Sequence, residues 1–195
     1  MLNPSMKKMN LRFNFNDYLL LPEDKKYEIL DGDLFTVPAP SIKHQRFSIR
    51  LSAALLRQLD NSGTVLAAPC DVLLSREDIV QPDIIFIRKN RSGIIGELNI
   101  QGSPDLVVEI ISPDTRERDV KAKRKIYSKF DIQEYWIVDP EKEIIEVLVW
   151  SEIGYVTAGI YNKSGRLCSP LLPNLKLQLS EIFQKWEKPR RRSFH

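Results

Sequence analysis

The feature that most constrains the fold is an apolar run at residues 106–111 that contains a single acid, Glu109. A run of this length in which all the other residues are apolar is typical of a central strand that is covered on both faces. A carboxylate inside such a strand must be paired, protonated or bound to a metal ion, because an isolated buried charge costs many kcal/mol. The sequence therefore predicts a layered sheet domain with one costly acid near its centre.

Periodicity and turn signals predict the other elements. Asp31-Gly32 lies between two short apolar runs and is the strongest short-range signal for a β-hairpin. Apolar residues recur at helical spacing through residues 43–60, where Asn61 to Gly63 would end the helix. Further helices are expected around residues 16–21, 116–130 and 180–186. Further strands are expected around residues 72–75, 83–88, 134–140, 144–150 and 155–161. Strands interspersed with helices indicate the α/β or α+β class, with a mixed sheet flanked by helices.

The length and composition favour one globular domain. A chain of 195 residues, 43% hydrophobic and 28% charged, is large enough to bury a core and too apolar to be disordered. We expect a single domain over residues 1–195, with its core at about 15–186 and a basic tail at 187–195. Without an export signal or a long apolar run, a cytoplasmic location is expected, and Cys70 and Cys168 are expected to be ordinary thiols.

The net charge of +3 is a weak argument for a nucleic-acid partner. From Lys185 onward, five basic residues accompany one acid, Glu187, so the rest of the chain is slightly negative. The tail could contact phosphates, but a solvated, frayed terminus is the simpler explanation of its charge.

Two strand acids are the first candidate site residues. Strand alternation places Asp83 on the same face as Ile85 and Ile87, and Glu109 on the same face as Val107. Each acid alone has a structural explanation, as a strand-end carboxylate partnered by an arginine. On neighbouring strands, however, the two could hold one Mg²⁺, which takes one or two protein carboxylates and keeps several waters.

The helix expected at 116–130 supplies the third candidate. Asp119, Lys123 and Tyr127 are spaced four residues apart and so share one helix face. A surface ion pair between Asp119 and Lys123 is the structural alternative. The functional alternative turns Lys123 inward, toward a phosphate beside the metal.

Several segments together resemble a known family. They are YEILDGDLFTVPAPS, His44, VQPDIIFI, PDLVVEIISPDTRERDVKAKRKIY and EYWIVDP, in that order. The succession resembles the Uma-two family of restriction endonucleases, within the PD-(D/E)XK nuclease superfamily, over roughly residues 15–150. The resemblance implies a restriction-endonuclease-like fold, a double-stranded DNA substrate and a homodimer.

The resemblance also implies roles for individual residues. The superfamily's first aspartate falls on Asp83 and its second acid on Glu109. The lysine expected two residues later is replaced here by Ile111, and Lys123 on the following helix is expected to substitute for it. Glu28 resembles an additional acid that many members place near the metal, although a hairpin surface glutamate is equally plausible.

The remaining candidates are possible substrate contacts. His44 starts a helix and could contact a phosphate or water, or merely cap and pack. Gln81 precedes Pro82 and could line the site or make a loop hydrogen bond, and Tyr127 shares the Lys123 face. Tyr135 and Trp136 fit a core-strand pattern and are expected to pack.

These residues suggest a metal-assisted hydrolysis of DNA phosphodiesters with Mg²⁺ or Mn²⁺ as cofactor. One alternative is a catalytically silent nuclease fold that binds nucleic acid or a protein partner. Another is a phosphoesterase that acts on small molecules and needs no DNA-sized basic surface.

Overall fold

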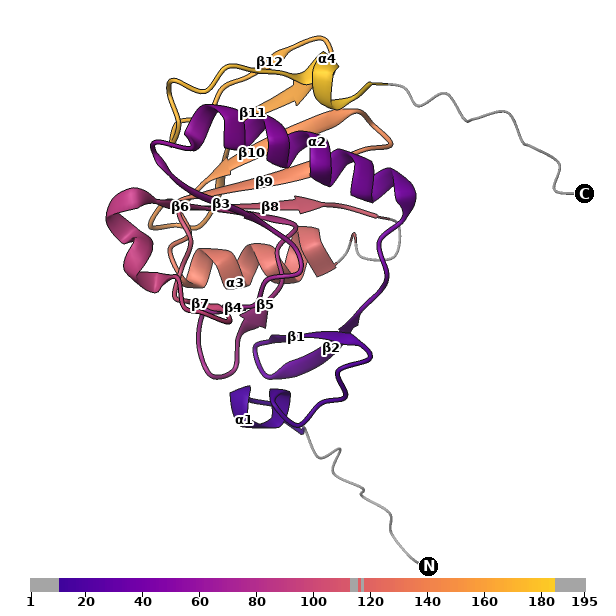
Figure 1. Ribbon diagram of the computed structural model, residues 1–195, viewed down its shortest axis with the longest axis vertical. Coiled ribbons are helices and arrows are strands. Elements are labelled where there is room, and N and C mark those ends of the chain that lie inside the picture. The colour runs from indigo at the N-terminus through magenta and orange to yellow at the C-terminus, as the bar shows by residue number, and fades with distance from the viewer. Residues whose placement is uncertain (1–10, 113–115, 117, 185–195) are drawn as a thin grey trace, which may run out of the picture.

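A six-stranded mixed sheet forms the centre of the protein (Figure 1). The computed structural model describes residues 11–112, 116 and 118–184. The strands follow the spatial order β11-β10-β9-β8-β6-β3. Their bounds are β3 Gly63–Ala67, β6 Ile84–Arg88, β8 Leu106–Ile110, β9 Glu134–Asp139, β10 Ile144–Val149 and β11 Val156–Asn162. Only the β8–β9 pair is parallel among the neighbours in this sheet.

The apolar run with its single acid is a central strand, as predicted. Every residue of β8 is buried, including Glu109, which is 3% exposed. Leu106, Val108 and Ile110 contribute to the core on one face of the sheet, whereas Val107 contributes to the core on the other. The two cores explain why this strand lacks the polar alternation of a strand with one wet face.

Helix α2 (Ile42–Leu59) covers the first face. The Ser41 hydroxyl caps it by accepting a 3.1 Å hydrogen bond from the backbone N–H of His44. Its buried apolar residues are those that the helical spacing predicted: Phe47, Leu51, Ala54, Leu55 and Leu59. Helix α3 (Arg124–Lys129) covers the opposite face through residues that include Ile126 and Tyr127.

A π-helical segment, η2 (Arg118–Lys123), runs directly into α3. The sequence predicted one regular helix over residues 116–130, and the wider turn of η2 is a departure from it. The side chain of Asp119 lies outside the part of the structure that is described, so the predicted pairing of Asp119 with Lys123 stays a prediction. Lys123 itself is the last residue of η2 and is buried.

A second, smaller sheet lies beside α3 and contains the predicted hairpin (Figure 1). Its order is β2-β1-β5-β4-β7, with β1 Lys26–Leu30, β2 Asp33–Val37, β4 Val72–Leu73, β5 Ile79–Val80 and β7 Ile100–Gln101. Asp31 and Gly32 form the two-residue loop with φ of 49° and 78°. Positive φ at both positions is characteristic of the type I′ turn that Asp-Gly favours.

Other elements differ from the predictions in extent. Helix α1 (Phe15–Tyr18) ends before residue 21, and α4 (Leu179–Ile182) ends before the limit of the described residues at 184. Strands β3, β5 and β7, and the pair β12 (Arg166–Leu167) and β13 (Leu177–Gln178), were not predicted. Most of them are two residues long, and strands this short depend on their partners rather than on local pattern. In the described part of the chain, no helix is long and apolar enough to span a membrane.

Glu134 is a buried acid with a structural role. Its carboxylate accepts hydrogen bonds from Trp136 Nε1 (2.6 Å), Ser169 Oγ (2.6 Å) and the backbone N–H of Leu171 (2.9 Å). These bonds attach the loop before β13 to the central sheet. Burial raises the pKa of Glu134, and the three hydrogen bonds oppose that shift only in part.

The packing of α2 predicts unequal costs for two leucines on the same helix. Leu51→Ala removes a side chain that is 0% exposed and should lower the free energy of unfolding by about 2–5 kcal/mol. Leu56→Ala, at a position that is 44% exposed, should change it by no more than about 0.5 kcal/mol. Urea unfolding curves of both variants test this, and equal losses would contradict the packing of α2 on the sheet.

The raised pKa of Glu134 predicts a pH dependence of stability. The folded chain holds this proton more strongly than the unfolded chain, whose carboxyl titrates near 4.5. The protonated Glu134 carboxyl stabilises the fold at pH values below 4.5. This stabilisation is lost as the pH rises through the pKa that Glu134 has in the folded chain. The difference in free energy of unfolding between the wild type and Glu134→Gln should therefore fall as the pH is raised. Urea unfolding at a series of pH values, from below 4.5 upward, measures this difference in the free energy of unfolding. Glu146→Gln on β10 is the control.

Candidate active site

The two strand acids, Asp83 and Glu109, come together at one end of β6 and β8. Ile84 pairs with Val108, so continuing that antiparallel register by one residue places Asp83 beside Glu109. The backbone N–H of Ile110 donates a 2.7 Å hydrogen bond to Asp83 Oδ2. This bond holds the Asp83 carboxylate against β8, next to the strand position of Glu109.

Lys123 lies between two carboxylates. Its Nζ is 2.7 Å from Glu28 Oε1 and 2.9 Å from Glu109 Oε1. The side chains of all three residues are at most 4% exposed. Lys123 thus points inward, as the functional alternative predicted, whereas Lys121 and Lys125 are exposed.

Backbone and tyrosine donors complete this buried cluster. The Tyr127 hydroxyl donates a 2.5 Å hydrogen bond to Glu109 Oε1, the atom that also accepts from Lys123. The backbone N–H of Gln81 donates to Glu28 Oε1 at 2.9 Å. Burial, together with the nearby charges of Glu109 and Glu28, raises the pKa of Tyr127 well above its ordinary value. Tyr127 therefore stays protonated and acts as a donor to Glu109.

His44 contacts the other acid. Its Nε2 is 3.1 Å from Asp83 Oδ2, and the two side chains are 15% and 16% exposed. Because His44 lies in the first turn of α2, the cap at Ser41 fixes the start of the helix and hence the place of the imidazole. The histidine therefore orients Asp83 from the side of the sheet that α2 covers.

A cavity of about 790 Å³ unites six of the seven predicted site residues. Glu28, His44, Gln81, Asp83, Glu109 and Lys123 all line it. Tyr127 is not among the lining residues and is 0% exposed, so it lies behind Glu109 and away from the cavity wall. Tyr135 and Trp136 are also 0% exposed and pack in the cores on opposite faces of the sheet, as predicted.

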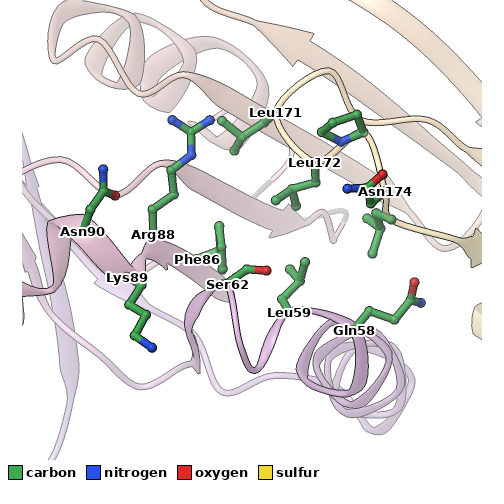
Figure 2. Close-up of a pocket in the computed structure, with 12 residues that line it drawn as sticks. Gln58, Leu59, Ser62, Phe86, Arg88, Lys89, Asn90, Leu171, Leu172 and Asn174 are labelled. Carbon is green, nitrogen blue, oxygen red and sulfur yellow. The ribbon is translucent and has the colours of Figure 1, made fainter.

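A second cavity, of about 390 Å³, lies between the C-terminal end of α2, the end of β6 and residues 171–175 (Figure 2). Leu59, Phe86 and Leu172 form its apolar part, and Arg88 lies at its edge. No acidic residue lines this cavity, so it offers no carboxylate to a cation. Of these two cavities, only the larger one is lined by acidic side chains.

Comparison with known families agrees with the site. The family described as "Uma2: Putative restriction endonuclease" matches residues 15–180, which is most of the chain. The chain belongs to this family. The resemblance noted from the sequence is therefore confirmed.

Comparison with solved structures supports the Uma2 fold. A crystal structure from Anabaena variabilis ATCC 29413, described as a putative nuclease belonging to DUF820, is similar with a TM-score of 0.74. The alignment covers 88% of this chain and 97% of that chain at 19% identity, a level at which the likeness shows the fold alone. No curated protein in the comparison matches this chain.

Two residues of the site were not predicted from the sequence. Asp71 Oδ1 accepts hydrogen bonds from Gln81 Nε2 (2.5 Å) and from the Tyr18 hydroxyl (3.0 Å). This contact fixes the Gln81 side chain at the cavity wall and ties α1 to the site. Neither residue stands in a motif or at a helical or strand spacing that could have revealed it.

The Tyr127 hydrogen bond predicts a difference between two buried tyrosines. Tyr127→Phe removes a hydrogen bond to a carboxylate and should lower the free energy of unfolding by about 1.5–3 kcal/mol. Tyr155→Phe removes a bond to the neutral carbonyl of Ile132 and should cost only about 0.5–1.5 kcal/mol. Chemical unfolding of the two variants tests this, and a smaller cost at Tyr127 would argue against its bond to Glu109.

Proposed function

We propose that this Uma2 protein is a metal-dependent endonuclease that hydrolyses DNA phosphodiester bonds. The observation that carries the proposal is the convergence of Asp83, Glu109 and Lys123 on one cavity. Asp83 directly precedes β6, Glu109 lies next to the last residue of β8, and Lys123 ends the helical segment η2. Family membership supports the reaction class, since the matching family carries the description "Putative restriction endonuclease".

The donor set at the cavity suits a divalent cation such as Mg²⁺ or Mn²⁺. Four acids, Asp24, Glu28, Asp83 and Glu109, line the cavity together with three lysines, Lys25, Lys26 and Lys123, which leaves one formal negative charge in excess. Mg²⁺ prefers carboxylate oxygens and needs only one or two of them, because waters complete its coordination. Among the described residues no group of three or more His, Cys, Asp or Glu is arranged as a metal site, so the proposed ligands are Asp83 and Glu109 alone.

Some residues of the proposed site would hold the metal ion, and Lys123 would stabilise negative charge on the phosphate. A bound divalent cation would polarise the phosphoryl oxygen and lower the pKa of a water molecule. Asp83 is oriented for this by His44 and by the Ile110 amide, and Glu109 by Tyr127. Lys123 presents a fixed positive charge on the cavity wall, where it would stabilise the negative charge that develops on the phosphate. Glu28 acts as a positioning residue that holds the Lys123 ammonium.

One observation favours a second candidate, a nuclease fold that binds nucleic acid or a protein partner without cutting. The Lys123 ammonium is only 2% exposed and already contacts two carboxylates, which offset its charge. Ile111 stands where the superfamily pattern has a lysine, so that position supplies no further positive charge. Cleavage assays separate the two candidates.

The test is cleavage of plasmid DNA, with DNA and RNA oligonucleotides in parallel, in Mg²⁺ or Mn²⁺. The wild type should cut DNA, and chelation of the metal should stop it. Asp83→Asn and Glu109→Gln should each lower the rate of cleavage about a hundredfold or more. The reason is that the bound metal would supply several kcal/mol of charge stabilisation in the transition state. Lys123→Met should lower the rate while leaving metal binding, measured by calorimetry, in place.

Glu146→Gln is the matched control, since this acid also lies on the central sheet but does not line the cavity. It should cut at the wild-type rate. Equal cutting by all variants would reveal a contaminating nuclease and contradict the proposal. Salt-sensitive DNA binding by a wild type that cuts under no metal would support the silent module instead.

A further inference from the structure

The cavity of the candidate site has a floor of buried lining residues and a rim of exposed ones. Glu28, Glu109 and Lys123 belong to the floor, and their side chains are at most 4% exposed. The Asp83 side chain, beside Glu109, is 16% exposed. A phosphate must therefore pass the rim before it can reach the two acids proposed to hold the metal ion. The rim thus limits which forms of DNA the site can accept.

Three chain segments form most of the rim. Residues 24–26, 36–41 and 68–69 all line the cavity, and all of them except Val37 are exposed. The sequence Pro-Ala-Pro at 38–40 lies in the link from β2 to α2 (Figure 1). Proline fixes φ near −65°, so this link is stiffer than a loop without proline. We therefore expect the rim to keep its width when a ligand enters.

The size of the cavity suits one nucleotide and its neighbours in a strand, not a double helix. Its volume of about 790 Å³ lies within the range of small-molecule sites, about 300–1,000 Å³. A DNA duplex is a stiff rod with a persistence length of about 150 base pairs, so it cannot fold into a hollow of this size. Enzymes whose reacting groups a duplex cannot reach act on single-stranded DNA or turn the nucleotide out of the helix.

The apolar part of the lining also suits an unpaired strand. Pro38, Pro40 and Pro69 lie on the rim, and Ile110 belongs to the floor. Apolar side chains can pack against the faces of unpaired bases, which in a duplex are covered by the neighbouring base pairs. A duplex offers mainly phosphates, sugars and the edges of its bases. The apolar lining would therefore contribute little to binding a closed duplex.

Two rim lysines favour a polymer over a small phosphate ester. Lys25 and Lys26 are exposed at the rim, where Asp24 offsets only one of their charges. In the described part of the chain, neither ammonium group forms an ion pair with an acid. A strand that leaves the cavity would carry its next phosphates past these lysines, whereas a small ester would end inside the cavity.

We propose that the cavity receives an unpaired segment of DNA, so that the enzyme cuts single-stranded or locally opened DNA and not the interior of a closed duplex. This substrate differs from the double-stranded DNA that the family resemblance implies. The proposal rests on the proposed nuclease function, because it names the form of DNA that the same site accepts.

The first test is cleavage in Mn²⁺ of one labelled oligonucleotide sequence in three forms. These are a single strand, a complete duplex, and a duplex with an unpaired internal segment. The wild type should cut the single strand and the unpaired segment more than about tenfold faster than the complete duplex, which must first be opened. Supercoiled plasmid should likewise be cut faster than the same plasmid after relaxation, because negative supercoiling favours strand opening. Cutting of the duplex as fast as the single strand would overturn the proposal and leave the nuclease function standing.

The double variant Lys25→Gln, Lys26→Gln tests the path of the strand over the rim. Binding of the labelled single strand is measured by fluorescence anisotropy in Ca²⁺ at a series of salt concentrations. Each lysine that contacts a phosphate should contribute about 0.7 to the slope of log K against log salt, so the slope should fall by about 1.4 in the double variant. Lys89→Gln is the matched control, because Lys89 is exposed at the opposite end of β6 from Asp83, and it should keep the wild-type slope. Thermal unfolding checks that both variants are folded, and an unchanged slope in the double variant would overturn the proposal.

The binding measurement separates this proposal from a failure of the nuclease function. If the wild type cuts no form of DNA, the nuclease function fails, but binding of the single strand about tenfold more tightly than the duplex still supports the proposal for the cavity. Equal binding of the two, or tighter binding of the duplex, would overturn it. Hydrolysis of bis(4-nitrophenyl) phosphate without cleavage or binding of any oligonucleotide would also overturn it, in favour of a small phosphate ester.

Discussion

The buried contact of Lys123 with Glu28 and Glu109 is the interaction on which the site and much of the fold depend. Burying an ammonium and two carboxylates costs several kcal/mol per ion, and close pairing with further donors is needed to offset that cost. Here the donors are the Tyr127 hydroxyl and the Gln81 amide. Because the participants come from the hairpin, the central sheet and the helix that covers it, the cluster can form only when both sheets and η2 are in place.

The cluster also explains why the two sheets meet where they do. β1 of the smaller sheet contributes Glu28, and β8 of the central sheet contributes Glu109. The single Lys123 ammonium between them neutralises one carboxylate charge and leaves the other, to which Asp83 adds its own. The fold thus brings together more negative charge than its own cations offset at this cavity. The proposed metal ion would offset this excess negative charge.

Sequence reasoning located the acids better than it located their partners. Glu109 and Asp83 stood out because a carboxylate in an apolar strand is costly wherever the strand lies, and this cost depends on local pattern alone. Helical spacing raised Lys123 as a candidate, and the family resemblance then favoured it and suggested Glu28. By contrast, the Asp71 contact with Gln81 joins loop and strand positions through a side-chain geometry that no periodicity encodes. The two-residue strands β5 and β7 of the smaller sheet were missed for the same reason, since each forms only by pairing with its neighbours in the sheet.

The position of the lysine shows why a motif spacing could not have settled the site. Ile111, two residues after Glu109, is 6% exposed and belongs to the apolar core beneath α3. A lysine at this position would have to place its charge in or beside that core. Lys123 instead reaches Glu109 from the end of η2, and Tyr127, one turn later in α3, donates to the same oxygen. The two helical segments therefore act on Glu109 together, so the strand can keep an apolar residue that packs while the helix supplies the cation.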